Sequence, residues 1–156
     1  MTNTTKVERT SDREVVVTRS FDAPIALVFE AWSTPDLFRR WWVPRSMGMT
    51  LTGCEMDVRT GGTYRLSFDG VDFFGRYLEV TPPSLIVWTN EESGPEGSVT
   101  TVTLTETDGA TTVVVTERYP SKEALDAQGG AEAAMDEVFT QLDELLVELA
   151  AAPPTD

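Results

Sequence analysis

The sequence predicts an α+β fold with an antiparallel sheet of about seven strands, two short helices after the first strand and one long C-terminal helix. Residues 49–118 lack a helical period and alternate β-branched or aromatic runs with turn signals, whereas the chain from about residue 131 carries one continuous apolar stripe. A sheet and a helix with one apolar side each bury these sides against each other. We therefore expect one domain over residues 13–152 and flexible termini at residues 1–12 and 153–156.

The N-terminal part of this domain predicts one strand followed by two helices. The first strand spans Arg13 to Ser20 through a β-branched run at 15–18. Asp22 is the expected cap of the next helix, and Pro24 suits its first turn. The helix itself is indicated by apolar residues at helical spacing, namely Ile25, Val28, Phe29 and Trp32. The segment 34–36 then starts a second short helix that runs through Trp41.

About six further strands are expected between residues 49 and 118. They are separated by turn signals at 61–62, 69–70, 82–83, 93–95 and 108–109. The clearest hairpin pairs residues 99–107 with residues 110–117 about Asp108-Gly109, because this dipeptide adopts the positive φ angles that a tight hairpin needs.

The C-terminal part predicts a short helical turn and then the long helix. Ser121 is the expected cap of a turn through Asp126, and the glycines at 129–130 separate it from a helix that begins near Ala131. Prolines at 153–154 end this helix. Its apolar stripe consists of Met135, Val138, Phe139, Leu142, Leu145, Leu146 and Leu149.

Composition excludes several classes of protein. The 156 residues hold 12 basic and 26 acidic side chains, a formal charge of −14, and this field repels nucleic acids. The chain has no targeting core and no apolar run of membrane length, so we expect a cytoplasmic protein with no membrane partner. With no histidine and one cysteine, it builds neither a Cys-His nor a Ser-His-Asp site, and we expect no metal and no cofactor. Cys54 is interpreted as a small core residue.

Several ordered motifs resemble one family. They are FRRWWVP at 38–44, CEMDVRTGGTYR at 54–65, FGRYLEVTPP at 74–83, LIVWT at 85–89, YPSKEALD at 119–126 and QLDELL at 141–146. Together they resemble bacterial homologues of the C-terminal domain of the heat-shock-protein-90 ATPase activator, in the SRPBCC or START-like superfamily. The resemblance covers roughly residues 13–150. It implies a helix-grip fold, in which a curved sheet wraps the long helix and often encloses a cavity for a hydrophobic ligand.

Seven residues are candidates for lining such a cavity. Trp41 ends the second short helix, where a flat ring can cover a ligand, and strand alternation places Tyr64 and Trp88 on apolar faces. On the long helix, Met135 and Phe139 have surfaces suited to lining a gap. For Trp41, Met135 and Phe139, ordinary core packing is the competing interpretation.

The remaining two candidates are Phe74 and Arg76, which alternation groups with Leu78 and Val80. Gly75 could mark a bulge that switches this phase, so the sequence leaves open whether Arg76 or Tyr77 faces inward. An inward Arg76 would need a carboxylate or an anionic ligand group, because an unpaired buried charge is strongly unfavourable.

Three functions fit these observations. The first is binding of a small hydrophobic or aromatic molecule for transport, sequestration or sensing. The second is a cyclase, dehydratase or hydrolase on a hydrophobic substrate, with a desolvated acid, Tyr64 or Tyr77 moving protons and Arg76 holding an enolate. The third is an interaction module like the chaperone activator. Exposed sheet edges and outward aromatic residues are also compatible with a homodimer.

Overall fold

The fold is one eight-stranded antiparallel sheet crossed by a long helix, in a computed structural model that describes residues 5–43, 46, 51–68, 71–91, 97–126 and 131–151. The strands are β1 Lys6–Arg9, β2 Glu14–Phe21, β3 Leu51–Met56, β4 Thr63–Phe68, β5 Val71–Thr81, β6 Leu85–Thr89, β7 Val99–Thr107 and β8 Ala110–Arg118. The helices are α1 Ile25–Ser33, α2 Pro35–Trp41, α3 Lys122–Asp126 and α4 Ala131–Ala151. The strand order is β1-β2-β8-β7-β6-β5-β4-β3. The predicted α+β helix-grip fold is confirmed.

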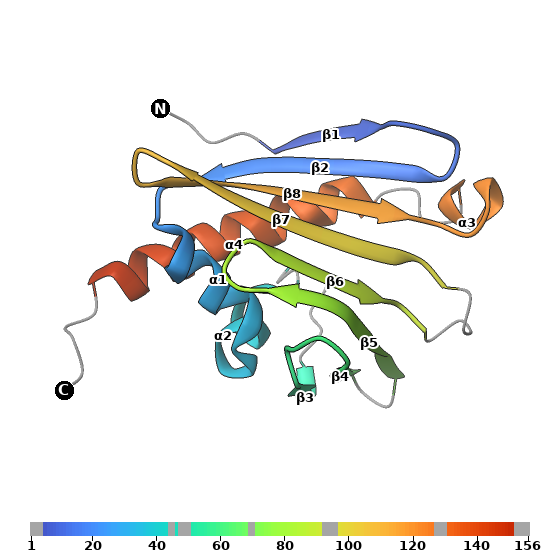
Figure 1. Ribbon diagram of the computed structural model, residues 1–156, viewed down its shortest axis with the longest axis horizontal. Coiled ribbons are helices and arrows are strands. Elements are labelled where there is room, and N and C mark those ends of the chain that lie inside the picture. Colours follow the sequence, from blue (N-terminus) through green and yellow to red (C-terminus); the bar gives the residue numbers. More distant parts are fainter. Residues whose placement is uncertain are drawn as a thin grey trace.

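The helix α4 runs along one face of the sheet, which we call the inner face, and the opposite side is the outer face (Figure 1). The predicted stripe faces the sheet: Val138, Phe139, Leu142, Leu145 and Leu146 are at most 4% exposed. The ring of Phe139 meets Phe21 of β2 edge to face at a centroid distance of 5.5 Å. Helices α1 and α2 also contact α4, so the three helices pack together on the inner side.

The predicted hairpin and the cap of α3 are confirmed. Asp108 and Gly109 adopt φ angles of 53° and 81° between β7 and β8. The hydroxyl of Ser121 accepts a hydrogen bond of 3.1 Å from the backbone N–H of Ala124. The predicted cap of α1 is wrong, because this helix starts after Pro24 and no side chain caps it.

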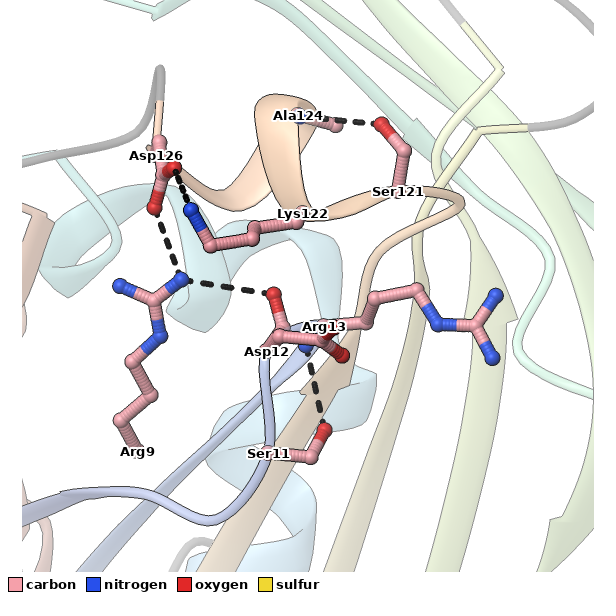
Figure 2. Close-up of polar contacts among 8 residues, drawn as sticks. All are labelled: Arg9, Ser11, Asp12, Arg13, Ser121, Lys122, Ala124 and Asp126. Atoms are coloured by element: carbon pink, nitrogen blue, oxygen red, sulfur yellow. Dashed lines mark hydrogen bonds and ion pairs between the residues drawn. The ribbon is translucent and has the colours of Figure 1, made fainter.

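The sheet has one more strand than expected, because the polar segment 6–9 forms β1 at its edge. Sequence patterning suggested a flexible terminus here, but β1 pairs with β2 in a register that joins Val7 to Val17. Figure 2 shows how the following turn is held: the guanidinium of Arg9 donates to Asp126 of α3 at 2.7 Å. Lys122 also binds this carboxylate, at 3.2 Å. Charged side chains thus attach an edge strand that has no apolar stripe.

A buried ion pair links α4 to the middle of β2. Arg19 points to the inner face with 6% of its side chain exposed, and its guanidinium donates to the carboxylate of Asp143. Its Cζ also lies 4.7 Å from the ring centroid of Phe21, a cation–π contact. Two residues before Asp143, the Gln141 amide donates to the carbonyl oxygens of Trp41 and Val43 at 3.0 and 2.8 Å. Polar contacts therefore fix α4 to the sheet and to the chain after α2.

Candidate functional site

The inner face is covered unequally, and the difference defines the candidate site. In β2, β7 and β8, the apolar side chains under α4 are at most 4% exposed, and the buried Arg19 of β2 lies among them. We call these residues the closed half: Val17, Phe21, Val102, Val113 and Val115. In β3, β4 and β5, the inner residues form the open half: Cys54, Met56, Tyr64, Leu66 and Phe73. Cys54 and Met56 are only half-buried there, and Phe73 is 39% exposed.

Strand register arranges the open half in two rows. Cys54 pairs with Leu66, which pairs with Phe73 across β4 and β5. In the second row Met56 pairs with Tyr64, which lies opposite Gly75. Because side chains alternate along a strand, all these positions share the inner face. The result is a continuous apolar surface that is only partly covered.

Gly75 allows the backbone of β5 to pack closely against Thr89 of β6 at this surface. A Cβ atom there would lie 1.9 Å from the carbonyl oxygen of Thr89, so only glycine fits without a backbone shift. The hydroxyl of Tyr64 donates to the same carbonyl at 2.7 Å and lies 3.2 Å from Oδ1 of Asn90. The Tyr64 ring lies beside Tyr77 at a centroid distance of 5.7 Å, with the two ring planes tilted by 56°.

An aromatic cluster connects the open half to the helices. Trp88 of β6 lies 6.5 Å from Tyr64, 6.1 Å from Trp32 of α1 and 6.2 Å from Trp42, measured between ring centroids. Trp88 and Tyr64 keep 7% and 8% of their surface exposed, while Trp42 is half-buried. Of the sequence candidates, Tyr64 and Trp88 therefore lie together on the inner face, and Met135 is half-buried on α4.

Trp41 and Phe139 are core residues in this structure. Neither has exposed surface, and the indole N–H of Trp41 donates to the carbonyl of Ala31 at 3.0 Å. Rings pack on both of them, with Trp32 4.7 Å from Trp41 and Phe21 5.5 Å from Phe139. The competing interpretation, ordinary core packing, describes these two positions, and no accessible surface remains on them for a ligand.

Trp32 differs from Trp41 in its hydrogen bonding. It is 2% exposed, and its Nε1–H has no hydrogen-bond partner among the described residues. Buried indole N–H groups are usually paired, because an unsatisfied buried donor is unfavourable by about 1–3 kcal/mol. The cluster therefore contains an unused donor next to Trp42 and Trp88.

Phe74 and Arg76 do not line the inner face, which corrects their grouping with the cavity residues. Phe73 and Gly75 pair with the inward Leu66 and Tyr64, and Tyr77 pairs with Trp88, so these alternate positions face inward. A bulge between Tyr77 and Glu79 then shifts the register, so that Val80 pairs with the inward Ile86. Tyr77 is 4% exposed, whereas the side chain of Arg76 is 59% exposed and pairs with Glu91 at 2.8 Å. Of the two residues, Tyr77 therefore faces inward and Arg76 faces outward. Arg76 cannot hold an enolate on the inner face.

The outer face of β3–β5 carries a charged hollow of about 520 Å³. Most of its lining comes from Glu55, Asp57, Thr63, Arg65, Phe74, Arg76 and Glu91, and Met56, Tyr64 and Gly75 of the second inner row complete it. Arg65 lies over the Phe74 ring at 5.2 Å and pairs with Asp72 at 2.5 Å. The hydrogen bonds from Arg76 and Thr89 lower the pKa of Glu91 below its usual value. Both arginines of the hollow are therefore already bound to carboxylates.

A row of polar side chains crosses the inner face beside Trp88. The Asn90 amide donates to Thr100 Oγ1 at 3.0 Å, and the Thr100 hydroxyl donates to Glu117 Oε1 at 3.3 Å. Tyr119 donates to Glu117 Oε2 at 2.7 Å. Thr100 is fully buried, but Asn90, Glu117 and Tyr119 are each half-buried. We call these four residues the inner polar row.

Burial changes the acidity of two groups near the open half. Desolvation raises the pKa of the Cys54 thiol, so this thiol is less acidic than a free cysteine. Desolvation also raises the pKa of the Tyr77 hydroxyl well above its usual value. Both groups are therefore neutral at physiological pH, and the open half is an apolar, uncharged surface.

Sequence analysis missed the inner polar row, the buried Arg19 and the unpaired N–H of Trp32. A signal existed for Glu117, which alternates with the inward Val113 and Val115 of β8. Asn90 shares the face of Trp88 by alternation, but its partners Thr100 and Ser98 follow only from the β6–β7 pairing. No local pattern marks an indole without a partner.

Fold and inner face together define a helix-grip domain of the SRPBCC type. The sequence profile of the family "Activator of Hsp90 ATPase homolog 1-like protein" matches residues 22–147. The chain belongs to this family, as its motifs indicated.

Solved structures of bacterial proteins share the fold. A Rhodobacter sphaeroides protein superposes with a TM-score of 0.84 at 24% identity, over 96% of this chain and 100% of that one. Protein Ms6760 from Mycobacterium smegmatis gives 0.80 at 23%, over 95% and 99%. CalU16 from Micromonospora echinospora gives 0.61 at 19%, over 96% and 90%. The curated proteins contain no significant match to the chain.

Within the residues that the structure describes, no helix is both long and apolar enough to cross a bilayer. In the same part of the chain, no three His, Cys, Asp or Glu side chains are grouped so that they could hold a metal ion.

Proposed function

We propose that the protein binds a small hydrophobic or aromatic molecule on the open half of the inner face. The observation that carries this proposal is the partial exposure of an inward apolar surface, in which Phe73 is 39% exposed beside half-buried Cys54 and Met56. A contiguous apolar surface that the helices leave partly uncovered marks a binding site more often than isolated apolar surface residues do.

The aromatic cluster supports the proposal. Flat rings at Tyr64, Trp88 and Trp42 offer large contact areas with few rotatable bonds, so little conformational entropy is lost when a ligand packs on them. A ligand acceptor that reached Trp32 Nε1 would also satisfy the unpaired donor. The binding residues that we propose are Tyr64, Trp88, Met135, Trp42, Met56 and Phe73.

The test is binding of N-phenyl-1-naphthylamine, a neutral aromatic probe whose fluorescence rises in apolar surroundings. The unmodified protein should enhance its fluorescence in a saturable way. Phe73→Asp should weaken binding by at least fivefold, because it puts a charge on the inner face. Leu78→Asp is the matched control, since Leu78 is 45% exposed on the same strand and points outward.

Two results would contradict the proposal. One is the absence of saturable binding by the unmodified protein. The other is an equal loss of affinity in Phe73→Asp and Leu78→Asp, which would place the probe elsewhere on β5. Native mass spectrometry of the purified protein adds an independent readout, because a retained apolar molecule would appear as a mass increment.

A further inference from the structure

We infer that the inner polar row recognises the polar end of the ligand, and that this end is a hydrogen-bond donor, a hydroxyl or a protonated amine, rather than a carboxylate. This inference rests on the proposed function and names the class of molecule that the site takes. The row consists of Asn90, Thr100, Glu117 and Tyr119, and no feature of the proposed apolar contacts uses it.

The row adjoins the aromatic surface through strand register. Tyr77 of β5 pairs with Trp88, Trp88 pairs with Thr100, and Thr100 pairs with Glu117. These four side chains form one line across the inner face, from the open half to β8. Facing residues of adjacent strands lie about 5 Å apart, so a ligand on Trp88 must span about 10 Å to place its polar end at Glu117.

Hydrogen bonds within the row all point toward Glu117. The Asn90 amide donates to the Ser98 and Thr100 hydroxyl oxygens, and the Thr100 hydroxyl donates to the Glu117 carboxylate. The Tyr119 proton is used by Glu117 as well. A carboxylate offers about four acceptor positions, and these bonds fill two of them. The half-buried end of the row therefore has acceptor capacity left, and a ligand group that meets it must donate.

Charge excludes an anionic head group. Glu117 forms no ion pair with any Lys or Arg in the described part of the chain. A ligand carboxylate would stand against this uncompensated charge and against the field of a protein with a formal charge of −14. A protonated amine would instead gain a charge-assisted hydrogen bond. We therefore expect the order amine, then alcohol, then acid.

Three probes with one ring system test this order in the full-length protein. They are 2-naphthylmethylamine, 2-naphthylmethanol and 2-naphthoate, which are cationic, neutral and anionic at pH 7. By isothermal titration calorimetry, the amine should bind at least tenfold more tightly than the acid, with the alcohol between them. This comparison uses the unmodified protein and does not depend on any variant folding.

Two variants locate the effect. Glu117→Gln keeps the shape and an acceptor but removes the charge, so the ratio of amine to acid affinity should fall at least tenfold. Glu91→Gln removes the same charge on the outer side, where Glu91 binds Arg76. This control should change the ratio by less than twofold. Thermal unfolding followed by circular dichroism checks that both variants fold.

Three outcomes overturn the inference. If the three probes bind with equal affinity, apolar binding stands and the head-group preference is wrong. If Glu117→Gln and Glu91→Gln change the ratio equally, the general field of the protein selects the ligand and the row does not. If none of the probes binds, the proposed function fails and this inference fails with it.

Discussion

The two halves of the inner face show how one sheet can serve stability on one side and binding on the other. The closed half lies beneath α4 and consists of small branched and aromatic side chains with almost no exposed surface. The open half contains sulfur-bearing and aromatic residues that remain partly exposed. The difference follows from the helix, which packs on β2 and on the two short helices. The open half remains available for binding because the apolar stripe of α4 does not pack on it.

This comparison predicts that equivalent truncations have very different costs in the two halves. Phe21→Ala in the closed half should lower the free energy of unfolding by about 3–5 kcal/mol, because it leaves a cavity in a fully buried site. Phe73→Ala should lower it by less than about 1 kcal/mol, because Phe73 already contacts solvent and the change leaves no closed cavity. Urea unfolding followed by tryptophan fluorescence measures both. Equal losses would show that the two halves are equally packed.

The ion pair that fixes α4 gives the next largest effect. Asp143→Asn leaves the buried guanidinium of Arg19 without a carboxylate, and should lower the free energy of unfolding by about 2–3 kcal/mol. This is less than for a fully buried pair, because Asp143 is 34% exposed. Glu148 is also on α4 and forms an exposed ion pair with Arg40 of α2. Glu148→Gln should lower the free energy of unfolding by less than about 1 kcal/mol. A larger loss for Glu148→Gln would contradict this ranking.

A substitution at Gly75 should damage the open half itself. Gly75→Ala should lower the free energy of unfolding by about 1–3 kcal/mol, because the new Cβ would meet the Thr89 carbonyl at 1.9 Å. Gly53→Ala is the control, since its Cβ would lie 3.3 Å from atoms of the Ser67 side chain. Urea unfolding of the pair checks the order. If Gly53→Ala were the more harmful change, the close approach of β5 to Thr89 would be refuted.

The smallest effect concerns the reactivity of the lone cysteine. Because burial raises the pKa of Cys54, its thiolate fraction at pH 8 is lower than in the unfolded chain. Labelling by a disulfide reagent should therefore be slower in the folded protein, and its rate should rise at higher pH than it does in guanidinium chloride. Bound N-phenyl-1-naphthylamine should slow labelling further. A rate that is unchanged by the probe would remove Cys54 from the bound surface.

Most of the fold could be predicted, because periodicity and turn chemistry are local. The helix stripe from Met135 to Leu149 and the Asp108-Gly109 hairpin are both where the sequence places them. β1 could not be predicted, because its four residues have no apolar alternation and are held by pairing with β2 and by the bond from Arg9 to Asp126. Tertiary contacts decide such an edge strand.

The candidate site was predicted only in part, for reasons of register. Tyr64 and Trp88 follow from alternation within single strands, but the phase of β5 depends on its pairing with β4 and β6, which places Phe74 and Arg76 on the outer face. Gly75 suggested a bulge, although its actual role is the close approach to Thr89. The predicted β7–β8 hairpin places Glu117 opposite Thr100, but its link to Trp88 depends on the pairing of β7 with β6, which a local pattern does not reveal.

The most direct test of the central claim is a titration of isotope-labelled protein with N-phenyl-1-naphthylamine, followed by two-dimensional NMR. We expect saturable changes in chemical shift at Cys54, Tyr64, Phe73 and the Trp88 indole, with smaller changes at Val17 and Val113 of the closed half. Changes confined to the outer hollow around Arg65 and Glu91, or no saturable change at all, would contradict binding on the open half of the inner face.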